Sequence, residues 1–209
     1  MHWEILDSER RKLLPALKFT TNLDLYLAGG TALALQLGHR KSVDFDFYSP
    51  KPLDERNLEI QLVSSIPHIT VTHRAAGTLI AQAGSVDLSF FYYPYSLLLP
   101  LVRTEYFDLA SVEDIAAMKI IAVTQRGVRR DFLDLFMMCQ KEGLEQILTW
   151  TKKKYPQFDS YMALKALTFF QDADKDESGR GMDLKPKVAW KKVRAFFEKE
   201  VLLLSRKKI

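Results

Sequence analysis

Cysteine is almost absent from this sequence. Its 209 residues contain only Cys139, so no disulfide can form within the chain, and the apolar helical run around it predicts a buried structural thiol. The four histidines have neither cysteine partners nor His-x-x-x-His spacing, which argues against a structural zinc site. Walker, dinucleotide-binding and Gly-x-Ser-x-Gly patterns are also missing, so their chemistries are not indicated.

Long apolar runs are missing as well. The longest, residues 90–102, carries two prolines and predicts a strand and a turn, and no run is long enough to cross a bilayer. The N-terminus lacks the apolar core of a signal peptide, so we expect a cytoplasmic protein with no membrane partner. Lysine and arginine (30) outnumber aspartate and glutamate (26), for a net charge of +4. This small excess fits an anionic partner and equally a solvated basic surface.

Two aspartates alternate with apolar residues in the segment Val43-Asp44-Phe45-Asp46-Phe47. In an extended strand, successive side chains point to opposite faces, so Asp44 and Asp46 share one face over a hydrophobic floor. Like charges this close repel each other, and a divalent cation held by carboxylate oxygens is the usual countercharge. The pattern predicts a metal-binding strand.

A glycine turn precedes this strand. The apolar residues 25–28 run into Gly29, Gly30 and Thr31, and then into the helix-forming residues 32–37. Glycine lets the backbone approach a bound group, and the amides at a helix N-terminus attract anions, so the turn is suited to phosphate. A phosphate-binding turn followed by paired carboxylates is the minimum equipment for nucleotidyl transfer.

Alternating apolar residues predict three further strands, at residues 69–73, 78–81 and 85–90. In the last of them, Asp87 points away from Val86, Leu88 and Phe90, which must face the core. A lone acidic residue in so apolar a strand is costly unless it is solvated or bound. Asp87 is therefore a candidate site residue, with an exposed edge-strand aspartate as the alternative.

The fold class we predict is α/β: a small mixed sheet with flanking helices in residues 1–108, followed by a helical region, residues 109–209, that closes over the nucleotide. One predicted helix is opened by Asp54, with Leu58, Leu62 and Val63 facing inward, and another starts at residue 129. The other predicted helices cover residues 3–18, 112–125, 143–154, 158–170 and 187–204. Residues 171–186 predict a mobile, solvated linker. Its acidic repeat is not a calcium loop, because Glu177 stands where that loop needs glycine.

Three motifs in this order resemble a known family signature: Gly29-Gly30-Thr31, His39-Arg40-Lys41-Ser42 and Asp44-Phe45-Asp46-Phe47. They are similar to the nucleotidyltransferases of the AbiEii/AbiGii toxin family, a branch of the polymerase-beta-like superfamily. A downstream block resembles the second conserved block of the same family: Lys119, Arg126, Arg130-Asp131 and Asp134-Leu135. The resemblance covers residues 1–140.

This resemblance implies residue roles. Asp44, Asp46 and Asp87 would hold two Mg²⁺ ions, with Asp87 completing the acceptor-side site and helping to take the acceptor's proton. Lys119 would contact the nucleotide phosphates and neutralise charge on the leaving pyrophosphate. The other residues that would bind or organise the NTP are Gly29, Gly30, Thr31, Arg40, Ser42, Asp131 and Asp134. For Asp134 a cap or a surface ion pair is an equal alternative, and for Lys119 a lesser one.

The family implies transfer of a nucleotide from an NTP to RNA such as tRNA, by a toxin of a toxin–antitoxin or phage-defence system with a cognate antitoxin as partner. The basic C-terminal residues, 188–209, could grip RNA phosphates or form a solvated helix face. A partner protein or a small molecule is the alternative acceptor. A nucleotide-binding module without transfer activity is the other alternative, although such a module has no need of a repulsive acidic cluster.

Overall fold

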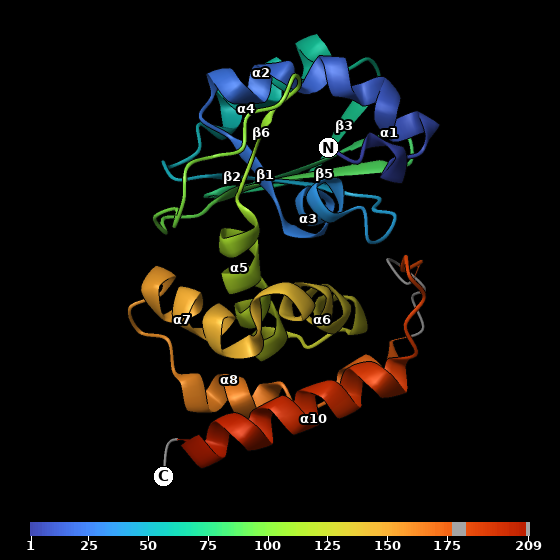
Figure 1. The fold of residues 1–209 in the computed structure, drawn as a ribbon. Helices are drawn as coiled ribbons and strands as arrows, with labels where there is room; N and C mark the ends of the chain where they lie inside the picture. The colour runs from blue at the N-terminus through green and yellow to red at the C-terminus, as the bar shows by residue number, and fades with distance from the viewer. Residues whose placement is uncertain (177–182, 208–209) are drawn as a thin grey trace. The chain divides into compact units, whose positions relative to one another are not determined.

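The computed structural model describes residues 1–176 and 183–207. The chain divides into two compact units, Met1–Ser111 and Val112–Ile209 (Figure 1). The first unit combines a mixed sheet with helices, and the second unit has helices as its regular elements in the described residues. The predicted α/β class, with a mixed sheet followed by a helical region, is confirmed.

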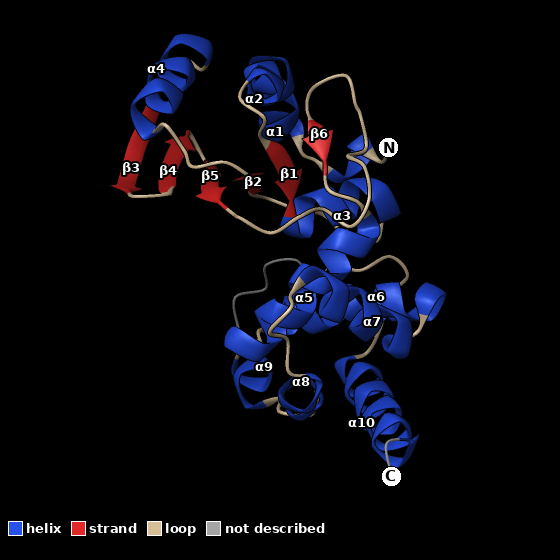
Figure 2. Cartoon of the chain, turned by 90° about the vertical axis from the view of Figure 1, so that its left-hand side faces the viewer, coloured by secondary structure: helices blue, strands red, loops and turns tan. Residues whose placement is uncertain are grey.

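A six-stranded sheet organises the first unit, in the order β3-β4-β5-β2-β1-β6 (Figure 2). Its strands are β1 (Tyr26–Ala28), β2 (Phe45–Ser49), β3 (Ile69–Ala75), β4 (Thr78–Ala83), β5 (Val86–Tyr92) and β6 (Asp108–Leu109). The central pair β2–β5 and the pair β1–β6 are parallel, and the other pairs are antiparallel. The predicted strands correspond to β3, β4 and β5.

Helices pack on this sheet, and α1, α2 and α4 lie on one of its faces (Figures 1 and 2). The helices of the first unit are η1 (Trp3–Ile5), α1 (Ser8–Leu13), η2 (Leu14–Lys18), α2 (Phe19–Asn22), α3 (Gly29–Leu37) and α4 (Glu55–Ser65), where η denotes a 3-10 helix. Phe45, Phe47, Leu88 and Phe90 are fully buried and alternate with polar or half-buried positions along β2 and β5. The hydrophobic core therefore occupies one face of these two strands.

Two helix predictions in the first unit are wrong in part. Residues 3–18 do not form a single helix, because the Asp7 side chain caps a new helix by accepting a hydrogen bond from the Arg10 amide, and Pro15 lies at the start of η2. In α4, Asp54 is the N-cap as predicted, and Leu58 and Leu62 are buried. Val63, predicted to face inward, is 60% exposed.

The second unit contains α5 (Val112–Gln125), α6 (Arg129–Glu142), α7 (Leu144–Lys154), α8 (Ser160–Ala166), α9 (Gln171–Lys175) and α10 (Trp190–Lys207). The predicted bounds of α5 match the structure, and Cys139 is buried in α6 as expected. The start of the predicted linker is instead helix α9, whose Ala173 is buried and accepts a 2.9 Å hydrogen bond from Arg129. Residues 177–182 of that linker, and residues 208–209 of the basic tail, lie outside the described residues.

In the described part of the chain, no helix is long and apolar enough to cross a bilayer.

Candidate active site

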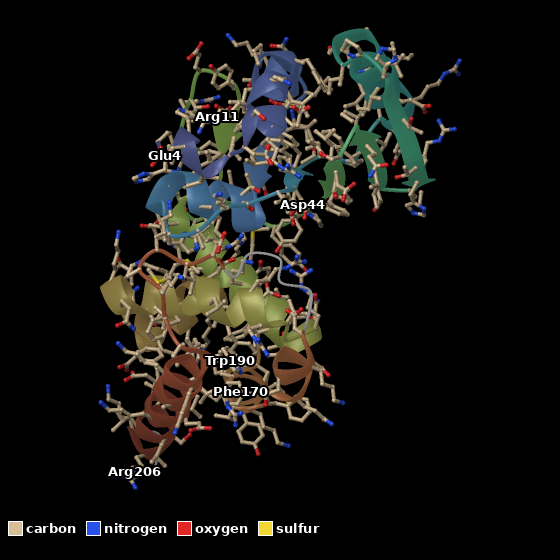
Figure 3. The ribbon with its side chains drawn as sticks, turned by 90° about the vertical axis from the view of Figure 1, so that its right-hand side faces the viewer. Glu4, Arg11, Asp44, Phe170, Trp190 and Arg206 are labelled. Carbon is tan, nitrogen blue, oxygen red and sulfur yellow. The ribbon has the colours of Figure 1, made fainter. Side chains whose placement is uncertain are left out.

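Asp44 and Asp46 lie at the start of β2. Phe45 and Phe47 are fully buried, whereas Asp46 is half-buried and points to the opposite face of the sheet. Asp44 immediately precedes the strand and is also half-buried (Figure 3). The period of the strand therefore directs both carboxylates away from the hydrophobic core, as their spacing predicts.

Strand β5 brings Asp87 to the same end of the sheet. In the parallel pair β2–β5, the first residues opposite each other are Phe45 and Leu88, so Asp44 and Asp87 each stand one residue before that pair. Neighbouring strands lie about 4.8 Å apart. Gln82 Nε2 donates a 3.1 Å hydrogen bond to Asp87 Oδ1 from the adjacent strand β4. Three carboxylates thus share one end and one face of two neighbouring strands.

The donor set of these carboxylates suits Mg²⁺, which prefers hard oxygen ligands. Within residues 1–176 and 183–207, no three histidine, cysteine, aspartate or glutamate side chains converge closely enough to hold a metal ion by themselves. Mg²⁺ is usually held by one or two protein carboxylates and completes its coordination with water and substrate phosphates. An open set of carboxylates is therefore compatible with this ion.

The glycine turn lies directly beside Asp46. Ala28 at the end of β1 is opposite Asp46 in the antiparallel pair β1–β2, and α3 begins at the next residue, Gly29. Gly29 has φ +67°, and a Cβ atom at this position would lie 3.2 Å from Asp46 Oδ2. A side chain here would be strained by the positive φ and would require the carboxylate to shift by a few tenths of an ångström. Since the N-terminus of a helix carries partial positive charge, α3 also stabilises negative charge at this point.

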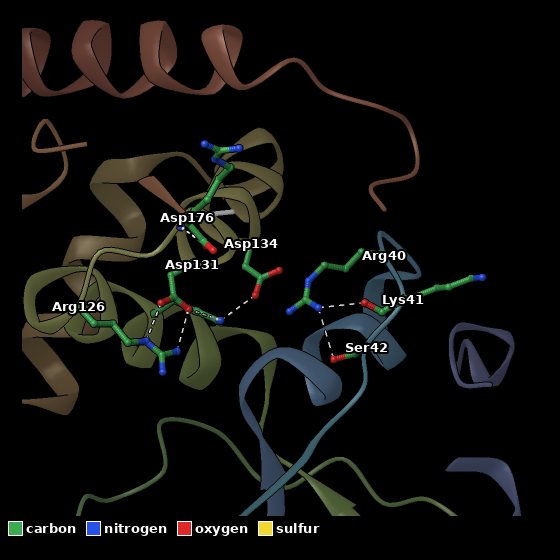
Figure 4. A network of polar contacts seen from close by, with 9 residues as sticks. Arg40, Lys41, Ser42, Arg126, Asp131, Asp134 and Asp176 are labelled. Carbon is green, nitrogen blue, oxygen red and sulfur yellow. Dashed lines mark hydrogen bonds and ion pairs between the residues drawn. The ribbon is translucent and has the colours of Figure 1, made fainter. Parts of the chain in front are cut away.

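Thr31, Arg40 and Ser42 form a chain of hydrogen bonds behind Asp44. Arg40 Nη1 donates to Ser42 Oγ at 3.4 Å and to the Lys41 carbonyl at 3.0 Å (Figure 4). Ser42 Oγ lies 2.7 Å from Thr31 Oγ1, and Thr31 donates its proton to the Asp44 carbonyl. All three of these polar residues are buried. The structure therefore brings them together around the segment that leads to Asp44, and their contact with phosphate stays a prediction.

The second unit holds the other candidate residues in one buried network. Lys119 Nζ lies 2.7 Å from Asp131 Oδ1 and 2.7 Å from Asp134 Oδ2, and Arg126 Nε lies 2.9 Å from Asp131 Oδ2 (Figure 4). Both aspartate side chains are fully buried, and that of Lys119 is 6% exposed. Burial raises the pKa of Asp131, but the charges and hydrogen bonds of Lys119 and Arg126 lower it by more, so the net pKa is below its ordinary value. The aspartates thus order Lys119, while its contact with a nucleotide stays a prediction.

Sequence reasoning missed several buried charged groups, among them Arg10 and Lys154. Arg10 in α1 is only 7% exposed, although it stands in a run of charged residues that is typical of a solvated helix face. Lys154 at the end of α7 lies 2.6 Å from Asp114, with both side chains fully buried. The sequence gives little signal for either burial, because the Val43 and Ser85 carbonyls that accept from Arg10, and the Asp114 partner of Lys154, are distant in the sequence.

Comparison with known proteins identifies a matching family and a relative. A family model described as the nucleotidyl transferase AbiEii toxin of type IV toxin–antitoxin systems matches residues 12–83, which include the glycine turn and the paired aspartates. An uncharacterized protein from Aquifex aeolicus, aq_aa25, is 35% identical over 184 residues, which cover 85% of this chain and 86% of that protein.

Two solved structures have a similar fold. JHP933 from Helicobacter pylori is 18% identical with a TM-score of 0.61, over 97% of this chain and 94% of that chain. MenT4, a nucleotidyltransferase toxin from Mycobacterium tuberculosis, is 17% identical with a TM-score of 0.55, over 93% of this chain and 82% of that chain. At such identities the likeness concerns the fold alone.

Proposed function

This chain belongs to the AbiEii nucleotidyl transferase family, and from that premise we propose that it transfers a nucleotidyl group from an NTP to an acceptor hydroxyl. The observation that carries the proposal is the grouping of Asp44, Asp46 and Asp87 at one end of β2 and β5. Carboxylate oxygens gathered at one end of two strands are the hard ligands that Mg²⁺ prefers, and a bound cation would reduce the repulsion among them.

One or two of these carboxylates would ligate each of two Mg²⁺ ions, and the phosphates of the bound NTP would complete the coordination. Mg²⁺ in such a site stabilises the attacking and leaving oxygens of the displacement. The N-terminal turn of α3, at Gly29 and Gly30, would offer backbone N–H groups and the positive end of the helix to the triphosphate. The hydrogen bonds of Thr31 would keep the Asp44 backbone in place while the substrate binds.

The transfer itself is a displacement at the α-phosphorus. The acceptor oxygen forms a bond to phosphorus, the bond to the pyrophosphate oxygen breaks, and Asp87 helps to take the acceptor's proton. Lys119, in the second unit, would neutralise the pyrophosphate as it leaves, and Asp131 and Asp134 hold that ammonium group in one position. We propose that the second unit closes the nucleotide site in this way.

The acceptor we propose is RNA, with tRNA as the first candidate, because this is the activity that the family resemblance implies. Exposed cations on α10 support an anionic macromolecule as substrate: Lys191, Lys192, Lys199 and Arg206. The matched family belongs to type IV toxin–antitoxin systems. We therefore propose that the chain acts as a cytoplasmic toxin and that a cognate antitoxin accompanies it.

A labelling experiment tests this function. The purified protein is incubated with Mg²⁺, each α-³²P-labelled NTP in turn, and total tRNA or cell lysate, and RNA is separated from protein on a gel. We expect label on RNA, and loss of that label in Asp44→Asn and in Asp46→Asn, because each substitution removes a metal-binding carboxylate. Asp24→Asn is the matched control, because Asp24 is an exposed aspartate of the same unit whose partner is the exposed Lys51.

The outcomes separate the alternatives. Label on a protein band would move the acceptor to a partner protein, and label on a low-molecular-weight product would indicate a small molecule. Binding of NTP without any transfer would favour a nucleotide-binding module. Transfer that survives in the Asp44→Asn, Asp46→Asn double variant would contradict the proposed site.

A further inference from the structure

Arg10 is a buried cation next to the carboxylate site. Its neighbours Arg11 and Lys12 in α1 are exposed, whereas Arg10 is 7% exposed. A buried guanidinium is costly unless its charge is paired and its N–H groups are hydrogen-bonded. The Arg10 side chain donates to three groups: to the Val43 carbonyl from Nε at 2.6 Å, to the Ser85 carbonyl from Nη2 at 3.3 Å, and to the Asp7 carboxylate from Nη1.

The two carbonyls belong to the segments that lead into the carboxylate strands. Val43 immediately precedes Asp44, and Ser85 stands two residues before Asp87. Strands β2 and β5 are parallel, so the chain enters both from the same end. One side chain from α1 therefore ties together two segments that are distant in the sequence, at the point where each delivers a carboxylate.

Arginine is suited to this task in a way that lysine is not. The guanidinium is planar and presents its N–H donors in a fixed fork, so two acceptors bound to it are held at a fixed separation. The Asp7 carboxylate supplies the countercharge. Burial raises the pKa of Asp7, but the hydrogen bond from the Arg10 amide and the charge of its guanidinium lower it by more, so Asp7 stays ionised at neutral pH.

We propose that Arg10 is a positioning residue, which sets the separation of Asp44 from Asp87 by bridging the Val43 and Ser85 carbonyls. The proposal rests on the proposed function, since it concerns the geometry of that site. Together with Thr31, which donates to the Asp44 carbonyl, Arg10 fixes the two peptide groups that flank the Asp44 Cα atom. A loss of this bridge lets the two strands separate at their carboxylate ends while the rest of the sheet stays paired.

Amide hydrogen exchange tests the bridge without reference to activity. In the full-length protein, Arg10→Gln should exchange faster than wild type in residues 43–46 and in residues 85–88, with other strand amides unchanged. Arg11→Gln is the control, because Arg11 is an exposed neighbour whose Nε donates to one carbonyl, that of Leu6. Figure 3 shows Arg11 and Asp44 in separate parts of the first unit. Unchanged exchange in both segments of Arg10→Gln would overturn the proposal.

Kinetics test the consequence for catalysis. Substitution of residues that orient metal ligands typically costs about 10- to 100-fold in metal affinity or activity. We expect such a loss in kcat/KM for Arg10→Gln, together with a higher Mg²⁺ concentration at half-maximal rate and no more than about a twofold change in Arg11→Gln. Equal activity in the Arg10→Gln and Arg11→Gln variants would also overturn the proposal that Arg10 is a positioning residue.

A second variant distinguishes loss of the bridge from general destabilisation of the protein. Arg10→Lys keeps the positive charge opposite Asp7, so this variant should stay folded. It lacks the planar set of guanidinium N–H donors, so its backbone amides in residues 43–46 or 85–88 should still exchange faster than in wild type. Full protection and full activity in Arg10→Lys would mean that the fork is not needed. If the wild-type protein transfers no nucleotide at all, the proposed function fails, and the exchange experiment still decides whether Arg10 joins the two strands.

Discussion

Gly29→Ala is the sharpest test of how the glycine turn serves the site. Alanine at φ +67° carries a backbone strain of about 1–2 kcal/mol. Its Cβ would also lie 3.2 Å from Asp46 Oδ2, so the carboxylate must move by a few tenths of an ångström. Because a displacement of about 1 Å in an active site can cost about a hundredfold in rate, we expect a loss of roughly tenfold here.

Gly84→Ala separates the two effects of this substitution. Gly84 has φ +60°, close to that of Gly29, but an added Cβ there meets nothing within 4 Å. Both variants should therefore lose about 1–2 kcal/mol of stability, or roughly 2–8 °C in Tm, by thermal unfolding. Only Gly29→Ala should lose activity in the labelling assay, measured well below both Tm values. Equal activity in the two variants would refute the idea that Gly29 makes room for the Asp46 carboxylate.

Three further predictions concern buried groups of the second unit. Asp114→Asn leaves the Lys154 ammonium buried without its carboxylate, so urea unfolding should show a loss of about 3–5 kcal/mol, against little change in the exposed Lys152→Met. Because the pKa of Asp131 is lowered in the native state, ionised Asp131 stabilises that state fully at pH values above the ordinary carboxyl pKa of about 3.9. This stabilisation is lost as the pH falls through the lower pKa of the native state. In Asp131→Asn the fall of unfolding free energy between pH 5 and acidic pH should accordingly be smaller. Burial raises the pKa of Cys139 to about 12, so a thiol reagent at pH 8 should react only under unfolding conditions, and fast reaction in native buffer would contradict the buried position.

Local pattern was sufficient for most of the first unit. The alternation in β3, β4 and β5 and the capping aspartate of α4 are visible in the sequence, because strand period and helix caps depend on nearby residues. The assignment of Val63 was wrong because α4 has several apolar residues, and the sequence alone does not show which of them face the sheet. Strand β6 was missed, since a two-residue strand carries no period.

The candidate site was predictable only where its residues lie close together in the sequence. The spacing of Asp44 and Asp46 predicts their shared face, but the position of Asp87 beside them depends on the register of a parallel pair. Arg10 and Lys119 were harder, because a charged residue on a helix looks the same in sequence whether it is solvated or paired. The sequence hypothesis assigned Lys119 to the nucleotide phosphates, which stays a prediction, but it gave no indication that Lys119 lies between two buried aspartates.

The parallel pairing of β2 with β5 has a consequence for synthesis on the ribosome. Asp46 leaves the ribosome well before Asp87, with α4 and the β3–β4 hairpin in between. At about 5–20 residues per second, the interval is roughly 2–8 s. During that time the nascent chain has its paired aspartates but no β5 to set beside them. The carboxylate group therefore assembles only after β5 has been made and has paired with β2, so under the proposed function no transfer activity can arise during this interval.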